Sequence, residues 1–192
     1  MTGISEESKE FATVERLGEM LRDIPAREPY RVTLTHALFT SILCWSVQRL
    51  RAPEHRTREA WERLEGEPVE DAPWSIPVDP AQKPQARGVG PFPEFQGFKA
   101  ARLLVALRNA VAHGDDRRIA PWNRGDSLIG HKFTCVEMDE RRRETFRGTI
   151  VLLREDMRRI GCALADRHCE AVNAASGHDL RGEARNLREA AR

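Results

Sequence analysis

TLTHALFTSILCWSVQRLR, residues 33–51, is the most apolar segment of this 192-residue sequence. Its large apolar side chains recur at steps of three and four residues and form one broad stripe: Leu34, Leu38, Ile42, Leu43, Trp45, Val47 and Leu50. An apolar face of that breadth predicts a helix at the centre of a helical bundle. Pro53 ends the segment, because proline breaks a helix interior.

Helical periodicity extends outward on both sides of this segment. Residues 5–24 predict an amphipathic helix, residues 57–64 a short one, residues 95–113 a strong one and residues 154–173 a last long one. Residues 128–137 and 146–153 are instead rich in β-branched and aromatic side chains and predict the two strands of a β-hairpin spanning 128–153. Residues 115–127 are expected to be a loop, and residues 138–144 a charged turn.

A proline-rich stretch interrupts the helical pattern. Seven of the eleven prolines lie within residues 66–95, which nearly excludes regular structure there. Its large apolar side chains are expected to pin the loop to the core: Trp74, Ile76, Val78, Phe92 and Phe95. The resulting fold is a single, mainly α domain over residues 1–192, with four to five helices, an inserted hairpin, this long loop and a polar tail at 176–192.

Charge is nearly balanced overall but unevenly spread. The chain has 31 basic and 30 acidic side chains, and only four of the basic ones are Lys. Residues 1–100 carry a net charge of −3, whereas residues 101–192 carry +4. This balance excludes indiscriminate coating of a polyanion. A phosphate-bearing partner is therefore expected to meet the second half of the chain.

Several classes of protein are excluded by the sequence. The apolar runs fall short of the roughly 18–20 residues that a membrane helix needs. The first residues are acidic and lack the features of a secretory signal. Four cysteines at irregular spacing do not form a disulfide framework in a chain of this length. We expect a reduced, soluble, cytoplasmic protein without membrane contact.

The segment Leu107–Asp115, LRNAVAHGD, carries the polar groups most suggestive of chemistry. Asn109 and His113 are four residues apart and share a helix face, whereas Arg108 and His113 are separated by about 140° around the axis and about 7.5 Å along it. Either the long Arg108 side chain reaches around the helix, or a second copy of the helix completes the arrangement. A helix C-terminus ending in His and Gly114 is also an ordinary stop signal, so a purely structural role stays open.

These side chains are suited to cleavage of a phosphodiester. The dipole at a helix C-terminus favours the protonated imidazole of His113 and so favours acid–base catalysis near neutral pH. Arg108 would bind the scissile phosphate and stabilise charge in the transition state, and Asn109 would orient either group. The 2′-hydroxyl of RNA supplies an internal nucleophile, so this chemistry requires no metal and no cofactor.

The string Arg108-Asn109-Ala110-Val111-Ala112-His113 resembles the signature of the HEPN superfamily, which is an Arg, a polar residue and a His a few positions later. The resemblance covers about ten residues, with a Pro-Trp-Asn sequence at 121–123 beyond them. It implies a helical homodimer in which two motif helices meet and form a metal-independent endoribonuclease site. Arg108 and His113 would then carry catalysis, Asn109 would support them, and the products would end in 2′,3′-cyclic phosphate.

The resemblance has further implications for biology. Many HEPN proteins act as toxins or in defence against phage and plasmids, so an antitoxin or regulatory protein is an expected partner. Others have lost activity, which leaves a catalytically inactive module that binds RNA or protein as the alternative. One toxin branch is controlled by AMP transfer to a Tyr two residues after the His. Asp115 stands there, so that form of control is not expected for this chain.

Other candidate sites are weaker. The best further RNA contacts follow the motif helix closely: Arg117, Arg118, Trp122 and Arg124. Arg141-Arg142-Arg143 lies among acidic residues and favours a solvated turn. Cys162, His168 and Cys169 lack the paired spacing of a zinc site, and His36 with Cys44 is better explained as core residues. Asp115, Asp116 and Asp126 are typical of solvated turns rather than of a magnesium site.

Overall fold

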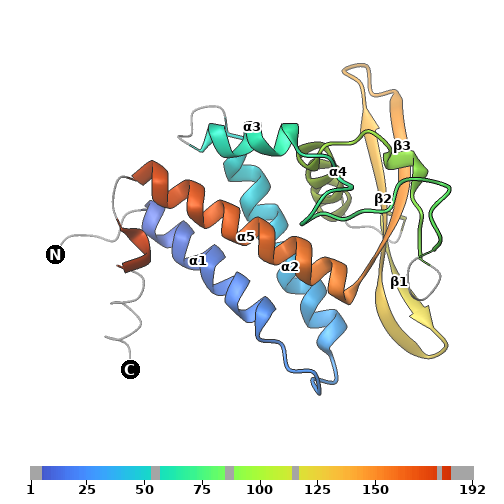
Figure 1. The fold of residues 1–192 in the computed structure, drawn as a ribbon, viewed down its shortest axis with the longest axis horizontal. Helices are drawn as coiled ribbons and strands as arrows, with labels where there is room; N and C mark the ends of the chain where they lie inside the picture. Colours follow the sequence, from blue (N-terminus) through green and yellow to red (C-terminus); the bar gives the residue numbers. More distant parts are fainter. Residues whose placement is uncertain (1–5, 53–56, 85–88, 114–116, 177–178, 183–192) are drawn as a thin grey trace.

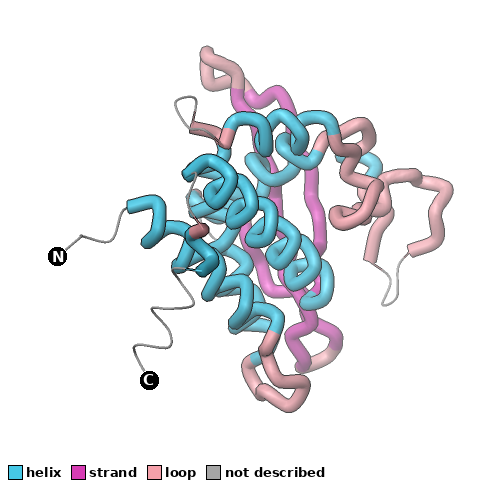
Figure 2. The backbone as a smooth tube through the Cα atoms, turned by 60° about the vertical axis from the view of Figure 1, so that its left-hand side comes forward, coloured by secondary structure: helices cyan, strands magenta, loops and turns pink. Residues whose placement is uncertain are grey.

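The computed structural model describes residues 6–52, 57–84, 89–113, 117–176 and 179–182 (Figure 1). In chain order the elements are α1 (Glu6–Arg22), α2 (Arg31–Leu50), α3 (Arg58–Gly66), the short 3-10 helix η1 (Pro93–Phe95), α4 (Ala100–Ala112), β1 (Ile119–Arg124), β2 (Ser127–Met138), β3 (Glu144–Leu153) and α5 (Arg154–Ser176). Figure 2 shows the helices gathered on one side of the sheet. In the described residues no helix is both long and apolar enough to cross a membrane.

Helices dominate the fold, as predicted, but the β structure is larger than the predicted hairpin. The three strands form one antiparallel sheet in the order β1-β2-β3. Strand β1 occupies six residues of the stretch 115–127 that was expected to be loop, and it pairs Ile119 with Phe133 and Arg124 with Ser127. Pro121 hid this strand from the sequence pattern, although an edge strand tolerates proline. Gly125, with a φ of +56°, and Asp126 form the two-residue connection to β2.

The motif helix begins five residues later than the predicted residue 95. Gly97 has a φ of +76°, and Lys99 is extended and bridges to Pro68 across the chain. The first helical amide, that of Ala100, donates a hydrogen bond to the carbonyl of Glu67 at 2.8 Å. The proline-rich segment therefore fixes the start of α4, which periodicity alone placed inside a longer helix.

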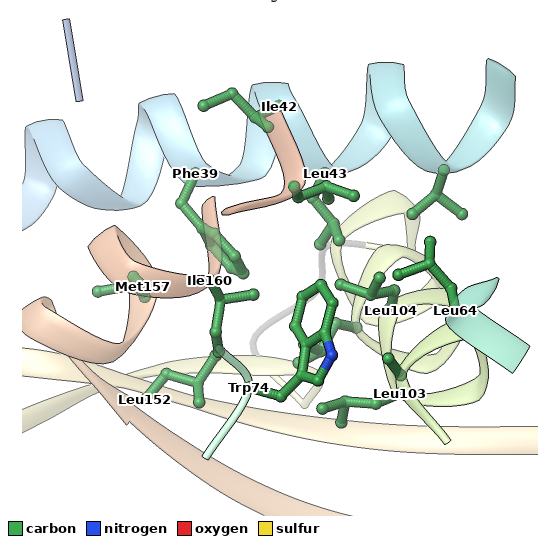
Figure 3. Close-up of a cluster of buried hydrophobic side chains, with 14 of the residues drawn as sticks. Phe39, Ile42, Leu43, Leu64, Trp74, Leu103, Leu104, Leu152, Met157 and Ile160 are labelled. Atoms are coloured by element: carbon green, nitrogen blue, oxygen red, sulfur yellow. The ribbon is translucent and has the colours of Figure 1, made fainter. Parts of the chain in front are cut away.

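Helix α2 lies at the centre of the hydrophobic core, as its sequence predicts (Figure 3). Its buried face centres on Leu38, Phe39, Ile42 and Leu43 and contacts α1, α4, α5 and the sheet. Two residues assigned to the inward stripe lie outside it, since Leu34 and Trp45 are 36% and 46% exposed. They are eleven residues apart, about three turns, and thus share the outer face of the helix.

The proline-rich segment is pinned to the core, as predicted. Trp74 is fully buried, and its indole N–H donates to Glu67 Oε2 at 2.9 Å. Arg167 of α5 pairs with the other oxygen of Glu67 at 2.6 Å, and Arg159 donates to the carbonyl of Pro73 at 2.7 Å. Ile76, Val78, Phe92 and Phe95 are also buried. The prediction of a pinned loop is therefore confirmed outside residues 85–88, which are not among the described residues.

The remaining helices follow the predictions closely. Helix α1 buries Phe11, Val14 and Leu21 against α5 and α2. The last helix runs three residues beyond its predicted end at Asn173, to Ser176. Leu180 of the predicted polar tail is buried, because its amide donates to the Asn173 side chain at 2.9 Å and holds it against the core. Most of that tail, including residues 183–192, lies outside the described residues.

Candidate functional site

Helix α4 carries the motif between α2 and the sheet. Its inner face is fully buried and consists of small and branched apolar residues: Ala100, Leu103, Leu104, Leu107 and Ala110. Its outer face includes Val105, Arg108 and Asn109, which are half-buried, and the exposed Ala112. The helical period therefore fixes which side of α4 faces solvent, and the motif residues lie on that side or at its end.

Arg108 and Asn109 are in direct contact. The Arg108 Nη1 donates a hydrogen bond to Asn109 Oδ1 at 3.2 Å, so the amide orients the guanidinium. Arg108 also lies near Cys44 of α2: burial raises the pKa of the Cys44 thiol, and the positive charge of Arg108 acts in the opposite direction. The guanidinium thus lies over the junction of α2 and α4, where it is partly desolvated and its charge is less screened.

His113 ends the helix rather than lying within it. It is the C-cap of α4, and its backbone amide donates to the carbonyl of Asn109 at 3.1 Å. Its side chain is exposed, so the imidazole is accessible to a ligand and is not a core histidine. Gly114, the predicted terminator, lies outside the described residues, as do Asp115 and Asp116.

A shallow groove of about 280 Å³ opens beside the motif. Arg108, Asn109 and Val105 line one wall, and the C-terminal turn of α2 lines the other with Gln48 and Arg51. Sequence reasoning missed Gln48 and Arg51. They lie some sixty residues before the motif, and only the packing of α2 against α4 brings the two segments together.

The four predicted RNA contacts do not form one surface. Arg117 is exposed near the end of α4, and the carbonyl of Arg118 accepts a hydrogen bond from the Thr134 amide at 2.8 Å. Trp122 is partly buried and packs against the core. Arg124 lies at the far end of the six-residue strand β1, about 20 Å along it. There it lines a different depression with Arg31 and Arg154.

The weaker candidates resolve into structural roles. Burial raises the pKa of both Cys135 and Cys169 to about 12, so these thiols stay protonated at neutral pH. In the described residues no group of three His, Cys, Asp or Glu side chains is arranged for a metal. Arg143 at the hairpin tip pairs with Asp139 at 2.7 Å, and Asp139 Oδ1 accepts the amides of Arg141 and Arg143, which is the pattern of a solvated turn.

His36 and Cys44 have different neighbours. The His36 ring stacks on that of His131 of β2, with the ring centroids 3.9 Å apart. Burial lowers the pKa of His36, and burial together with the charge of His36 lowers the pKa of His131 to about 4. The pair therefore joins α2 to the sheet as two neutral rings at pH 7 and is separate from the Cys44 thiol near Arg108.

Comparison with protein-family models, curated proteins and solved structures finds no match for this chain. The case for a function thus depends on the residues of α4 and on the surface around them. The groove beside Arg108 and Asn109, with the accessible imidazole of His113 at the end of the same helix, is the arrangement from which that case is made.

Proposed function

We propose that this chain is a metal-independent endoribonuclease of the HEPN type that acts as a homodimer. The observation that supports it best is the geometry of α4, in which Arg108 and Asn109 are hydrogen-bonded at a groove and His113 is exposed at the end of the same helix. A cation able to bind phosphate and a side chain able to transfer protons near neutral pH are what hydrolysis of RNA requires.

In the proposed mechanism the 2′-hydroxyl of RNA attacks the adjacent phosphorus. An imidazole from one copy of His113 accepts the hydroxyl proton, and the 5′-oxygen leaves with a proton from an imidazolium. Arg108 binds the non-bridging oxygens and stabilises the charge that develops on them, while Asn109 holds the guanidinium in place. The products are a 2′,3′-cyclic phosphate and a 5′-hydroxyl, and no metal takes part.

The spacing of the motif supports a homodimer. Arg108 and His113 project about 140° apart around α4, so a single helix does not direct both at one phosphate by spacing alone. The outer face of α2 adds apolar surface next to the motif helix. Trp45 on this face follows Cys44, which lies near Arg108. Leu34 and Ala37 are exposed on the same side of α2. Packing two such faces together would bury this surface and bring two motif helices into contact.

The decisive experiment is cleavage of a labelled RNA in the presence of EDTA. Wild type, Arg108→Ala and His113→Ala are compared with Arg16→Ala, which removes an exposed arginine of α1 far from the motif in the sequence. We expect both motif variants to lose at least about 100-fold in rate, the usual effect of removing an acid–base group or a transition-state cation. Arg16→Ala should cleave at the wild-type rate.

Analysis of the product ends distinguishes this mechanism from others. Terminal 2′,3′-cyclic phosphate supports attack by the 2′-hydroxyl, whereas cleavage that persists in both motif variants contradicts the proposed site. Wild-type protein that binds RNA with a dissociation constant unaffected by EDTA, and never cleaves it, supports the alternative of an inactive RNA-binding module. Analytical ultracentrifugation tests the dimer in the same samples.

A further inference from the structure

A second groove continues the one beside the motif. It has a volume of about 370 Å³ and is lined by Trp61 and Glu65 of α3, by Lys99, and by Arg102 of α4. Arg51 and Val105 belong to both grooves, so the two join end to end along the outer face of α4. We call the joined surface the α4 track. From Lys99 to Arg108 it spans ten residues, a rise of about 13 Å along the helix.

The α4 track has a local excess of positive charge. In the described part of the chain, Arg51, Lys99 and Arg108 form no ion pair. Arg102 is different, because Glu137 accepts two hydrogen bonds from its guanidinium at 3.0 and 2.8 Å and neutralises its charge. Glu65 is the acidic side chain lining the surface. Among the described residues, three cations without an ion pair therefore line the track, against one carboxylate.

Arg102 is held rigidly in place. Besides its bidentate pair with Glu137, its guanidinium lies 3.9 Å from the centre of the Phe98 ring and 5.5 Å from that of Phe146. This arrangement holds Arg102 in a defined position between α4 and the sheet, at one side of the track.

Trp61 supplies the aromatic component of the track. It is half-buried on α3 and packs against the core, while part of the residue lines the second groove. Cationic side chains that follow a backbone, combined with an aromatic ring on which a base stacks, are the common features of surfaces that bind single-stranded nucleic acid. A double helix presents its bases stacked internally and offers none to a ring in a shallow groove.

We propose that the α4 track binds the single-stranded RNA that flanks the cleavage point, with Arg51 and Lys99 on its phosphates and Trp61 stacked on a base. This inference depends on the proposed function for its choice of ligand. It assigns the substrate as unpaired RNA and locates its path from Arg108 toward the start of α4. Arg51, Lys99 and Trp61 are binding residues in this assignment, and the chemistry stays with Arg108 and His113.

The test measures binding separately from cleavage. The protein carries His113→Ala throughout, so the RNA stays intact, and the probe is a fluorescein-labelled 12-nucleotide RNA of mixed sequence read by anisotropy. Arg51→Gln, Lys99→Gln and Trp61→Leu are compared with Arg63→Gln, which removes an exposed cation of α3 outside the track. Trp61→Leu retains apolar contact with the core, and thermal melts confirm that each variant is folded.

We expect Arg51→Gln and Lys99→Gln each to weaken binding about fivefold and to reduce the slope of log affinity against log salt by about 0.7, the value for one phosphate contact on a single strand. Trp61→Leu should weaken binding about tenfold without changing the slope. Arg63→Gln should bind as its parent does. A duplex of the same sequence should bind more weakly than the single strand.

The outcomes separate this inference from the proposed function. Equal affinity of the folded track variants and Arg63→Gln for the single strand overturns the track, even if wild type cleaves RNA. Loss of affinity in the track variants supports the track, even if wild type cleaves nothing, in which case the ribonuclease assignment alone fails. Preference for the duplex also overturns the assignment of unpaired RNA.

Discussion

Two grooves of this molecule differ both in size and in the charge of their rims. The groove between α3 and α5 is the larger of the two, at about 540 Å³, against about 280 Å³ for the groove beside the motif. Its rim carries three carboxylates, from Glu59, Asp166 and Glu170, and two guanidinium groups. Both of those cations are paired, Arg63 with Glu59 at 3.8 Å and Arg167 with Glu67 at 2.6 Å.

The contrast indicates where a polyanion would be stabilised on this nearly neutral protein. A paired guanidinium contributes little to a new phosphate contact, because the carboxylate beside it repels the phosphate. The track along α4 leaves Arg51, Lys99 and Arg108 without carboxylate partners in the described residues. Charge therefore favours α4 over the α3/α5 groove as the place where RNA would bind.

The largest expected effect concerns the sheet that supports α4. A Cβ added at Gly130 of β2 would lie 2.4 Å from the carbonyl oxygen of Leu152 and 2.9 Å from the Cα of Leu153. Because backbone atoms cannot move aside cheaply, Gly130→Ala should reduce the free energy of unfolding by about 3 kcal/mol. Gly66→Ala, at the end of α3, meets nothing within 4 Å and should change it by less than about 1 kcal/mol. Urea unfolding followed by circular dichroism measures both, and equal stability of the two variants would contradict the tight strand pairing.

The second prediction distinguishes a cation of the track that takes part in catalysis, Arg108, from one that only binds phosphate, Arg51. Arg108→Lys keeps the charge but removes the planar fork that binds two phosphate oxygens, so kcat for RNA cleavage should fall about 100-fold. Arg51→Lys keeps all that a phosphate contact needs and should change kcat by less than about twofold. Single-turnover cleavage measures both. Comparable losses would show that Arg51 belongs to the catalytic centre.

The third prediction concerns a substitution that gives the α4 track a charge pattern like that of the α3/α5 groove. Arg51→Glu gives the track a second carboxylate beside Glu65 and so imitates the α3/α5 groove. RNA affinity should fall at least about tenfold, with a shallower salt dependence. Arg63→Glu makes the same charge change in the α3/α5 groove and should leave affinity within about twofold. If the two reversals weaken binding equally, the effect is one of net charge and the contrast between the grooves fails.

The smallest effect is a dependence of stability on pH that arises where α2 meets the sheet. His131 has a folded-state pKa of about 4, below the value of about 6.5 for an unfolded chain, because of its burial and the charge of the neighbouring His36. As the pH falls through about 6.5 the unfolded chain binds protons first, so the free energy of unfolding decreases between about pH 6.5 and 4 and is constant above that range.

The check compares wild type with His131→Phe, which keeps a ring against His36 but does not titrate. Melting temperatures are measured at pH 7.5, 6.0 and 5.0. As the pH falls, the melting temperature should decrease less in the variant than in wild type. If acidification lowers the melting temperature equally in the two proteins, the acid sensitivity arises from another group.

Some elements of this fold could be predicted from the sequence of a single segment. The apolar face of residues 33–51 identified the central helix, and the period of Phe11, Val14 and Leu21 identified α1. Strand β1 was missed because Pro121 suppresses the strand pattern, although Gly125-Asp126 is a two-residue hairpin signal. Trp45 was misassigned to the core because its spacing from Ile42 fits an inward stripe, and only the neighbours of α2 decide which edge of a wide stripe is covered.

The candidate site likewise has features that the sequence predicts and features that only the folded chain brings together. The adjacency of Arg108 and Asn109 and the end of the helix at His113 are local properties of one segment, and the sequence predicts them. The separation of Arg124 from Arg117 depends on the extended strand between them, which the sequence pattern did not reveal. The grouping of Arg51, Trp61 and Lys99 around α4 depends on three elements that meet only in the folded chain.

By itself, the sequence determined the approximate positions of the helices, the apolar stripe on each and the polar motif at the end of α4, because each depends on residues a few positions apart. Tertiary structure decided which cations remain without a carboxylate. Glu137 reaches Arg102 across thirty-five residues, and Glu67 reaches Arg167 across one hundred. These two pairings are long-range properties of the packed chain. Arg51, Lys99 and Arg108 remain as the cations of the α4 track without an ion pair in the described residues.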